Sequence, residues 1–494
     1  MPEPRFFAAA DLGASSGRVI LGELSEGCFT LHEVARWENG PTDKANEALH
    51  WDTPHLFDEV VAGFRAAYDA SAGRLESVAV DTWGVDYGRI GRDGELLELP
   101  FHYRDSRTDG MIAKVFSIIP AERLYAEAGL QVQPFNTIFQ LAAQAGDPRW
   151  GEVDAILLTP DLLGHWLTGR RWAEATIAST TGLLDPGTRQ WSATITDSLR
   201  EELGLPLPRV LPELVEPGTV VGPIKQELVP GDVAVVAVGS HDTASAVVTV
   251  PAEVNDFAFI SSGTWSLVGL ELPAPVLTAA SEEANFTNEL GVDGTTRFLR
   301  NVMGLWVLIE CRREWAGASG RELGWGEVIE LAAGAEPLAA VIDMEDERLL
   351  PPGDMVGRVR ALAAERGQAL SEEPAAVIRC ILDSLALSYR RAIAEACRVA
   401  DRTVSVVHIV GGGSANGLLC QLTADACGVP VVAGPTEGTA LGNLLVQARA
   451  MGALSGGLAD LRAVARASST LQTYEPGRLG LDPTAWDAAA ARLA

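Results

Sequence analysis

The sequence predicts an α/β protein whose two similar domains flank a central cleft. An apolar hairpin with a turn of small residues opens each half of the chain, and strand-like and helix-like segments alternate after each hairpin. The first hairpin runs from Phe6 to Leu21, and the second begins at Phe257. A chain of 494 residues, 47% of them hydrophobic, is long enough to bury two cores.

The first hairpin places an acid beside a turn of small residues. Asp11 ends the first apolar run, and Arg18 opens the second. The turn between them is Gly13, Ala14, Ser15, Ser16 and Gly17. Such a turn exposes backbone N–H groups that can bind phosphate, and a carboxylate can hold a metal ion. The pattern favours metal–nucleotide binding, although a simple hairpin is the commoner meaning of such a turn.

Polar residues follow three further apolar strands in the first half. The strands are expected at residues 75–81, 155–158 and 233–238. Because ligands bind at the carboxyl ends of strands in open α/β sheets, Asp81, Asp86 and Asp242 are expected at a binding edge. A small-residue helix is expected at 243–250. Asp242 therefore also stands where a helix N-cap would stand, which is the more frequent role of such an aspartate.

The second half contains a strand, a glycine turn and a helix. They are expected at residues 404–410, 411–416 and 417–427. Consecutive glycines let a flat ring or a phosphate approach the backbone, although a tight strand-to-helix loop uses the same residues. The proline and the polar residues at 251–256 are typical of a linker. We therefore expect one domain at residues 1–250 and a second at 251–494.

Composition and charge exclude several classes of protein. A formal net charge of −28 argues against nucleic-acid and anionic-membrane partners. The three lysines, Lys44, Lys114 and Lys225, never follow a glycine, which excludes a P-loop, and none lies in a protein-kinase Val-Ala-Ile-Lys strand. No apolar run reaches the ~18 residues of a membrane span, so we expect a cytoplasmic protein. The six cysteines show no CxxC pair, and we expect reduced thiols.

Ten motifs in order carry a resemblance along nearly the whole chain. They are DLGASSGRV (11–19), LHWD (49–52), DTWGVDYG (81–88), YRDSRTDGM (103–111), FNTIFQL (135–141), IASTTGLLDP (177–186), HDTASAV (241–247), SSGTWSLVG (261–269), RNVMGLW (300–306) and GGGSAN (411–416). With them the chain resembles the FGGY carbohydrate kinases, and the HDTASA and TWGVD stretches resemble the rhamnulokinase branch. The resemblance implies two actin-like (ribonuclease H-like) domains, as in the superfamily of actin, Hsp70 and the sugar kinases.

The resemblance also implies a reaction and its residues. ATP, with Mg²⁺ and bound between the two domains, would phosphorylate L-rhamnulose at O1 in L-rhamnose catabolism. Asp242 resembles the general base, and Asp11 resembles a metal-side acid acting through water. The residues that resemble sugar contacts are Gly84, His241, Asp242, Thr243 and Asn301. Those that resemble nucleotide contacts are Ala14, Ser15, Ser16, Gly17, Arg18, Thr264 and Gly412.

One position departs from the family pattern. Where that pattern has a glutamine that contacts the nucleotide, an ungapped alignment places Ile309. Isoleucine cannot make the hydrogen bond, and we expect it to pack against the base instead.

Two alternatives stay open. The chain could phosphorylate another ketose, such as L-fuculose or xylulose, or it could be a non-catalytic, nucleotide-gated sugar sensor on the same scaffold. Its partners would be a small ketose and ATP, and it would be a monomer or a small homo-oligomer.

Overall fold

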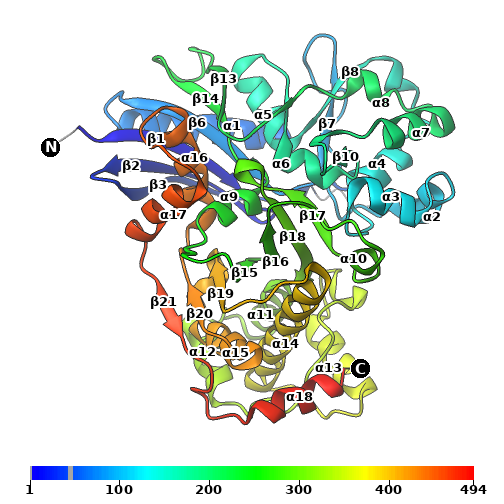
Figure 1. Cartoon of the computed structure of the whole chain (residues 1–494), viewed down its shortest axis with the longest axis vertical. Coiled ribbons are helices and arrows are strands. Elements are labelled where there is room, and N and C mark those ends of the chain that lie inside the picture. The colour runs from blue at the N-terminus through cyan, green and yellow to red at the C-terminus, as the bar shows by residue number, and fades with distance from the viewer. Residues whose placement is uncertain (1–2, 43–47, 494) are drawn as a thin grey trace. The chain divides into compact units, whose positions relative to one another are not determined.

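The computed structural model describes residues 3–42 and 48–493, and it divides into two compact units (Figure 1). Unit 1 consists of Met1–Thr249, Glu271–Phe298 and Gly438–Ser468. Unit 2 consists of Val250–Leu270, Leu299–Glu437 and Ser469–Ala494. Each unit thus combines segments that are distant in the sequence.

A six-stranded mixed sheet forms the centre of unit 1. Its spatial order is β13 (Thr219–Pro223), β14 (Ala234–Ala237), β6 (Leu75–Thr82), β1 (Arg5–Leu12), β2 (Ser16–Ser25) and β3 (Cys28–Glu38). Strand β2 is antiparallel to β1 and β3, whereas β6 is parallel to both β1 and β14. Phe6 and Ala8 enter one apolar core, and Phe7 and Ala9 enter the core on the opposite face. Burial on both faces explains the unbroken apolar run of β1.

Helices cover both faces of this sheet. Helix α1 (Thr53–Ala70) contributes to the first core, and α16 (Gly438–Ala450) and α17 (Leu458–Ala467) contribute to the second. In Figure 1, α16, drawn in orange, lies beside the blue strands β1 and β6. Helix α16 packs directly on α9 (Asp242–Val248), because a Cβ on Gly442 would lie 1.8 Å from the carbonyl oxygen of Ser245. Glycine is therefore required at this crossing.

The other elements of unit 1 include a lobe with its own apolar core, to which Ile138 and Phe139 on α4 and Leu199 on α7 belong. The strands are β4 (Pro41–Thr42), β5 (His50–Trp51), β7 (Tyr87–Gly91), β8 (Val153–Leu158), β9 (Ala173–Glu174), β10 (Leu184–Asp185), β11 (Gln190–Trp191), β12 (Leu214–Val215) and β17 (Thr287–Leu290). The α-helices are α2 (Met111–Phe116), α3 (Ala121–Ala128), α4 (Thr137–Ala143), α5 (Thr159–Thr168), α6 (Ala175–Ala178), α7 (Ala193–Leu203), α8 (Leu207–Val210) and α10 (Ala279–Glu283). The 3-10 helices are η1 (Ser106–Thr108), η2 (Pro148–Gly151), η3 (Ser179–Thr181) and η4 (Val292–Gly294).

Unit 2 also contains a mixed sheet. The sheet has seven strands in the order β17, β18 (Thr296–Met303), β16 (Trp265–Leu272), β15 (Phe257–Ser262), β19 (Val406–Val410), β20 (Val431–Ala433) and β21 (Gln472–Tyr474). Strand β17 and the first three residues of β18 belong to unit 1. Strand β15 is antiparallel to β16 and parallel to β19. The helices are α11 (Trp306–Ser319), α12 (Trp325–Gly334), α13 (Met355–Glu365), α14 (Pro374–Ala400), α15 (Gly417–Cys427) and α18 (Pro483–Ala491), with 3-10 helices η5 (Glu347–Leu349) and η6 (Gly412–Ala415).

The structure confirms the predicted α/β class and the elements that led to it. Both hairpins form, and the strands expected at 75–81, 155–158, 233–238 and 404–410 lie within two residues of their predicted ends. The helix expected at 417–427 is α15, and the one expected at 243–250 is α9. All six cysteines are free thiols. In the described part of the chain, no helix has the length and hydropathy of a membrane span.

Candidate functional site

Three neighbouring strands of unit 1 end in polar residues at the same edge of the sheet. In the parallel pairing of β1 with β6, Asp11 lies opposite Asp81. Beyond them, the N–H of Thr82 donates to the carbonyl of Ser240 at 2.9 Å. The chain that follows β14 thus runs beside the end of β6 and delivers His241 and Asp242 to that edge. Asp81 and Asp242 thus lie at one edge together with Asp11, whereas Asp86 follows four residues after the end of β6.

Asp242 is the first residue of α9, and His241 occupies the N-cap position. Oδ1 of Asp242 accepts hydrogen bonds from the N–H and the hydroxyl of Thr243, at 2.5 and 3.0 Å. In the described part of the chain no hydrogen bond involves Oδ2 of Asp242, and 31% of the side chain is exposed. Burial raises the pKa of Asp242, and the negative charge of Asp11 adds to that rise while His241 opposes it. Thr243 thus holds the carboxylate by Oδ1, and Oδ2 remains available to a ligand.

The acids around Asp242 differ in their partners. Nε and Nη2 of Arg18 donate to Oδ2 of Asp11 at 3.0 and 2.8 Å. Asp81 is fully buried and accepts from Nδ2 of Asn443 at 2.6 Å, while its Oδ1 has no hydrogen-bond partner among the described residues. Burial, together with the charge of Asp11, raises the pKa of Asp81 well above its usual value. Folding therefore favours the neutral, protonated form of Asp81.

The predicted phosphate turn between β1 and β2 is held by backbone bonds and by β3. The N–H of Gly13 donates to the carbonyl of Ser16 at 2.9 Å, and Asn39 bonds to the carbonyls of Gly13 and Ser15. A Cβ on Gly17 would lie 2.3 Å from the ring of Trp37, so this position requires glycine. Ala14 and Ser16 are half-buried, and Ser15 is exposed. The tip of the turn is thus accessible while its base is fixed.

A strained turn carries Gly84. The N–H of Asp86 donates to the carbonyl of Gly84 at 2.9 Å, and Val85 between them has a φ of 70°. A positive φ on a β-branched residue costs about 1–3 kcal/mol and persists only where its surroundings enforce it. Here the hydroxyl of Thr180 accepts from the N–H of Val85, and the hydroxyl of Thr137 donates to the carbonyl of Val85. The conformation of the Gly84 segment is therefore set by the lobe of unit 1.

Asp86 fixes the aromatic residues beside that turn. Its Oδ2 accepts from the indole N–H groups of Trp51 and Trp83, at 2.6 and 3.0 Å, and from the N–H of Tyr103. Its Oδ1 accepts from Gln140 at 2.9 Å. Burial raises the pKa of Asp86 to about 6, with the hydrogen bonds from Trp51, Gln140 and Trp83 opposing the rise. With hydrogen bonds to both of its oxygens, Asp86 orients Trp51 and Trp83.

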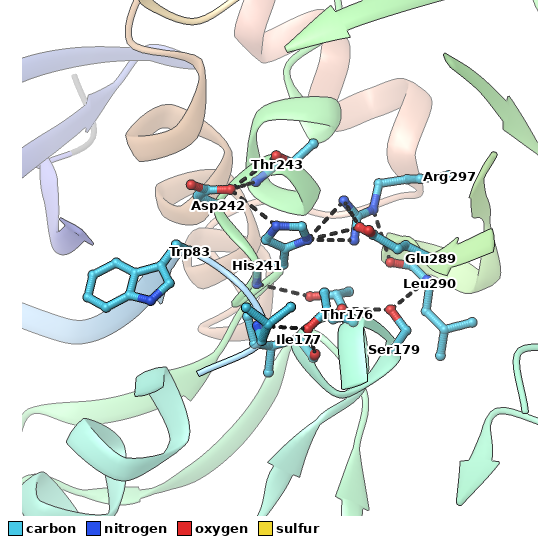
Figure 2. A network of polar contacts seen from close by, with 12 residues as sticks. Trp83, Thr176, Ile177, Ser179, His241, Asp242, Thr243, Glu289, Leu290 and Arg297 are labelled. Atoms are coloured by element: carbon cyan, nitrogen blue, oxygen red, sulfur yellow. Dashed lines mark hydrogen bonds and ion pairs between the residues drawn. The ribbon is translucent and has the colours of Figure 1, made fainter. Parts of the chain in front are cut away.

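His241 is part of a buried network of charges, shown in Figure 2. Its Nδ1 lies 3.0 Å from Oε2 of Glu289, and Nη1 of Arg297 lies 3.0 Å from the same oxygen. Its Nε2 lies 3.5 Å from Oδ1 of Asp242. Burial would raise the pKa of Glu289, but Arg297 and then His241 outweigh it and lower that pKa. Glu289 is therefore an anion at neutral pH.

A second buried acid, Glu174, holds the backbone of the same segment. Its Oε2 accepts from the N–H of Ser240 at 3.1 Å and from the hydroxyl of Thr176 at 2.6 Å. The hydroxyl of Thr176 in turn accepts from the N–H of His241 at 3.3 Å. Burial raises the pKa of Glu174 to about 7. The residues before Asp242 are thus fixed at both backbone and side chain.

In unit 2, the predicted nucleotide residues lie on neighbouring elements. The carbonyl of Thr264 accepts from the N–H of Trp306 at 3.1 Å, so the β15–β16 turn contacts the start of α11, and Ile309 follows one helical turn later. The end of β15 runs parallel to the end of β19, which leads to Gly412. A Cβ on Gly412 would meet no atom within 4 Å, so the backbone there can be approached closely. Asn301, on β18, also belongs to unit 2 and is half-buried.

The residues of unit 1 fit the predicted phosphate and metal chemistry. Backbone N–H groups of residues 14–16, at the tip of the turn, suit phosphate oxygens. The Asp11 carboxylate beside them suits Mg²⁺, which is bound by one or two carboxylates together with phosphates. Within residues 3–42 and 48–493, no group of three or more His, Cys, Asp or Glu side chains is arranged to hold a metal ion. These residues therefore do not form a metal site built from protein ligands alone.

Sequence reasoning did not identify Glu174, Glu289, Arg297, Asn39 or Asn443. None of them belongs to a local pattern that predicts a site. Only pairing each buried carboxylate with a cation or an amide distant in the sequence would have found them.

Comparisons with known proteins agree with this fold and its motifs. The model of the FGGY family of carbohydrate kinases, N-terminal domain, matches residues 6–249, and that of the C-terminal domain matches residues 258–451. The rhamnulokinase of Bacteroides thetaiotaomicron is 39% identical over 492 residues, which cover 98% of this chain and 97% of the relative. The rhamnulokinase of Pectobacterium carotovorum subsp. carotovorum is 40% identical over 474 residues, 95% of this chain and 92% of the relative.

Solved structures show the same fold at low identity. The gluconate kinase from Lactobacillus acidophilus superposes with a TM-score of 0.77 at 16% identity, over 99% of this chain and 96% of that one. The Plasmodium falciparum glycerol kinase with ADP gives a TM-score of 0.77 at 14% identity, over 99% and 97%. Together, the two family models and the near full-length relatives show that this chain is a sugar kinase and belongs to the FGGY family of carbohydrate kinases.

Proposed function

We propose that the protein transfers the γ-phosphoryl group of ATP to O1 of L-rhamnulose, with Asp242 as the general base. The observation that carries the proposal is the state of Asp242, whose Oδ1 is held by Thr243 while Oδ2 stays open at the strand edge. The high identity to proteins named rhamnulokinase over nearly the whole chain supports the choice of sugar.

The chemistry needs a base that acts late. The C1 hydroxyl oxygen attacks the γ-phosphorus, the bond from that phosphorus to the β,γ-bridging oxygen breaks, ADP leaves, and the hydroxyl proton passes to Asp242. An ordinary aspartate, with a pKa of about 4, is a weak base for an alcohol. Burial raises the pKa of Asp242 and so strengthens it as a base. Because phosphoryl transfer has a loose transition state, orienting the hydroxyl contributes as much as taking its proton.

ATP and Mg²⁺ would be held by residues of both predicted domains. In residues 1–250, the turn from Ala14 to Gly17 and Arg18 would bind phosphate, and Asp11 would hold Mg²⁺ through water. In residues 251–494, Thr264, Gly412 and the surface of Ile309 would bind the nucleotide. The metal ion would supply neutralisation of phosphate charge. Gly84, His241, Thr243 and Asn301 would contact the sugar.

A panel of ketoses tests the proposal. The purified protein is incubated with Mg-ATP and L-rhamnulose, L-fuculose, D-xylulose or L-xylulose, and ADP release and the sugar phosphate are measured. We expect the highest kcat/KM with L-rhamnulose and a product phosphorylated at O1. A higher kcat/KM with another ketose would assign a different substrate, and ATP binding without turnover on any sugar would favour the sensor alternative.

A further inference from the structure

We propose that Glu289, held by Arg297, is a positioning residue that fixes the ring of His241 for the sugar. This inference rests on the proposed function, because it concerns the residue that would contact the substrate beside the base. It adds to the site two residues from the segment that follows β16 in the chain, which no motif pointed to.

The contact between Glu289 and His241 indicates which ring nitrogen of His241 carries a hydrogen. A carboxylate oxygen can only accept, so the 3.0 Å contact between Oε2 of Glu289 and Nδ1 of His241 requires the hydrogen on Nδ1. Nη1 and Nη2 of Arg297 also lie within hydrogen-bond distance of Nδ1, at 3.3 Å, and Nη1 forms an ion pair with the same Oε2 at 3.0 Å. We place the hydrogen on Nδ1 because the contact with Oε2 is the shorter of the contacts at that atom. Nε2 then lies on the side of the ring that faces Asp242, 3.5 Å from its Oδ1.

The anchor of this contact is rigid. The side chains of Glu289 and Arg297 are 6% and 0% exposed, and Nε of Arg297 also donates to the carbonyl of Leu290 at 3.1 Å. The N–H of Leu290 donates to the hydroxyl of Ser179 at 2.9 Å, which ties β17 to η3 (Figure 2). A carboxylate with so little freedom holds the ring in one orientation.

The consequence concerns the sugar hydroxyls. With Nδ1–H committed to Glu289, Nε2 is the ring nitrogen left to form a hydrogen bond with a hydroxyl of a polyol next to the one that Asp242 deprotonates. If the ring turned over, that hydrogen bond would be lost. Glu289 thus acts on the substrate only through His241.

Two variants separate this role from packing. Glu289→Asp keeps a negative charge for Arg297 but withdraws the carboxylate by one methylene from Nδ1, and Glu289→Gln removes the charge. The matched control is Glu271→Gln, which removes the charge from another buried ion pair of unit 1, with Arg462 at 2.9 Å and both side chains 9% exposed. We expect both Glu289 variants to lower kcat/KM for the ketose about 10- to 100-fold, as loss of a partner behind a functional imidazole does. KM for ATP should stay within twofold, and Glu271→Gln should change neither constant.

A double variant and a spectroscopic measurement complete the test. In a His241→Asn background, Glu289→Asp should cost less than a further twofold, because residues that act as a unit are not additive. The ¹⁵N shifts of labelled His241, assigned by their loss in His241→Asn, should show hydrogen on Nδ1 in the wild type and a changed tautomer mixture in Glu289→Asp. A Glu289→Asp enzyme as active as Glu271→Gln, or additive losses in the double variant, would overturn the inference. Wild-type protein that phosphorylates no ketose would reject the proposed function, and the ¹⁵N spectra would still decide the role of Glu289.

Discussion

The sheets of the two units share a strand order but differ at their functional edges. Unit 1 has β3-β2-β1-β6-β14, and unit 2 has β18-β16-β15-β19-β20. In each, the first strand forms a hairpin on one side and pairs with a parallel strand on the other. The edge of unit 1 carries Asp11 and Asp81, whereas β15 and β19 of unit 2 lead to Ser262 and Gly411.

The difference shows how one backbone plan serves two tasks. Carboxylates at strand ends can bind a metal ion or take a proton, but they need partners such as Arg18 and Asn443 to be buried. Serine and glycine at the corresponding ends need no such partners and leave room for a ligand to approach the backbone. Substitutions at the carboxylates of unit 1 are therefore expected to change mainly the rate of transfer, and substitutions at the glycines of unit 2 mainly the affinity for nucleotide.

The strongest test of this division is Asp242→Asn. The amide can still accept hydrogen bonds from Thr243, so the start of α9 should keep its conformation and the sugar should still bind. It cannot take a proton, and we expect kcat to fall by about 10²- to 10⁴-fold. Steady-state kinetics, with circular dichroism as a control of folding, measure the effect. A variant that keeps more than about a tenth of the wild-type kcat would show that Asp242 is not the base.

How far the sequence predicts such a site depends on the range of the interaction. The hairpin turn at 13–17 and the glycines at 411–413 follow local conformational rules, so their elements were predicted to within two residues. Asp242 was predicted at the edge because only a short turn separates it from a strand, and its role came from the resemblance to the family. In contrast, the pairing of Asp81 with Asn443 joins residues 362 apart in the chain. Tertiary packing decides which side chains of this kind form a pair, and no residue spacing in the sequence predicts the pair.

The second test uses pH, since buried acids with raised pKa values cluster in unit 1. Folding raises the pKa of Glu174 from its ordinary value of 4.5 to about 7, which corresponds to about 3 kcal/mol. For an acid with a raised pKa, this stability is fully present below pH 4.5 and is lost as the pH rises to about 7. The melting temperature should therefore fall between pH 5 and 7.5, and less so in Glu174→Gln. A wild-type melting temperature that is flat or rising in this window would contradict the assignment.

The third test compares two adjacent glycines of unit 2. A Cβ on Gly413 would lie 2.0 Å from Oγ of Ser262, so Gly413→Ala should destabilise the protein by about 1–3 kcal/mol. Gly412→Ala places its Cβ in open space, and we expect less than about 0.5 kcal/mol. If the nucleotide lies against this backbone, Gly412→Ala should instead raise KM for ATP. Thermal unfolding and ATP kinetics separate the two effects, and equal stability losses in both variants would contradict the packing of this turn.

The smallest expected effect is at Ile309, where this chain departs from the pattern of its family. Ile309 is half-buried on α11, one turn after the contact of that helix with Thr264. The neighbouring Glu310 cannot replace the missing amide, because its carboxylate is bound to Arg313 and to the N–H of Gly353. A neutral hydrogen bond is worth about 0.5–1.5 kcal/mol net, so its absence is tolerable.

Ile309→Gln should therefore lower KM for ATP by a few-fold and leave kcat nearly unchanged, which is the pattern of a uniform binding term. Ile309→Met, which keeps an apolar side chain of similar volume, is the control and should change neither constant. The effect should be confined to the nucleotide, so KM for the sugar should also stay constant. An unchanged KM for ATP, or a large fall in kcat, would show that this position does not face the nucleotide and that the alignment of α11 with the family pattern is shifted.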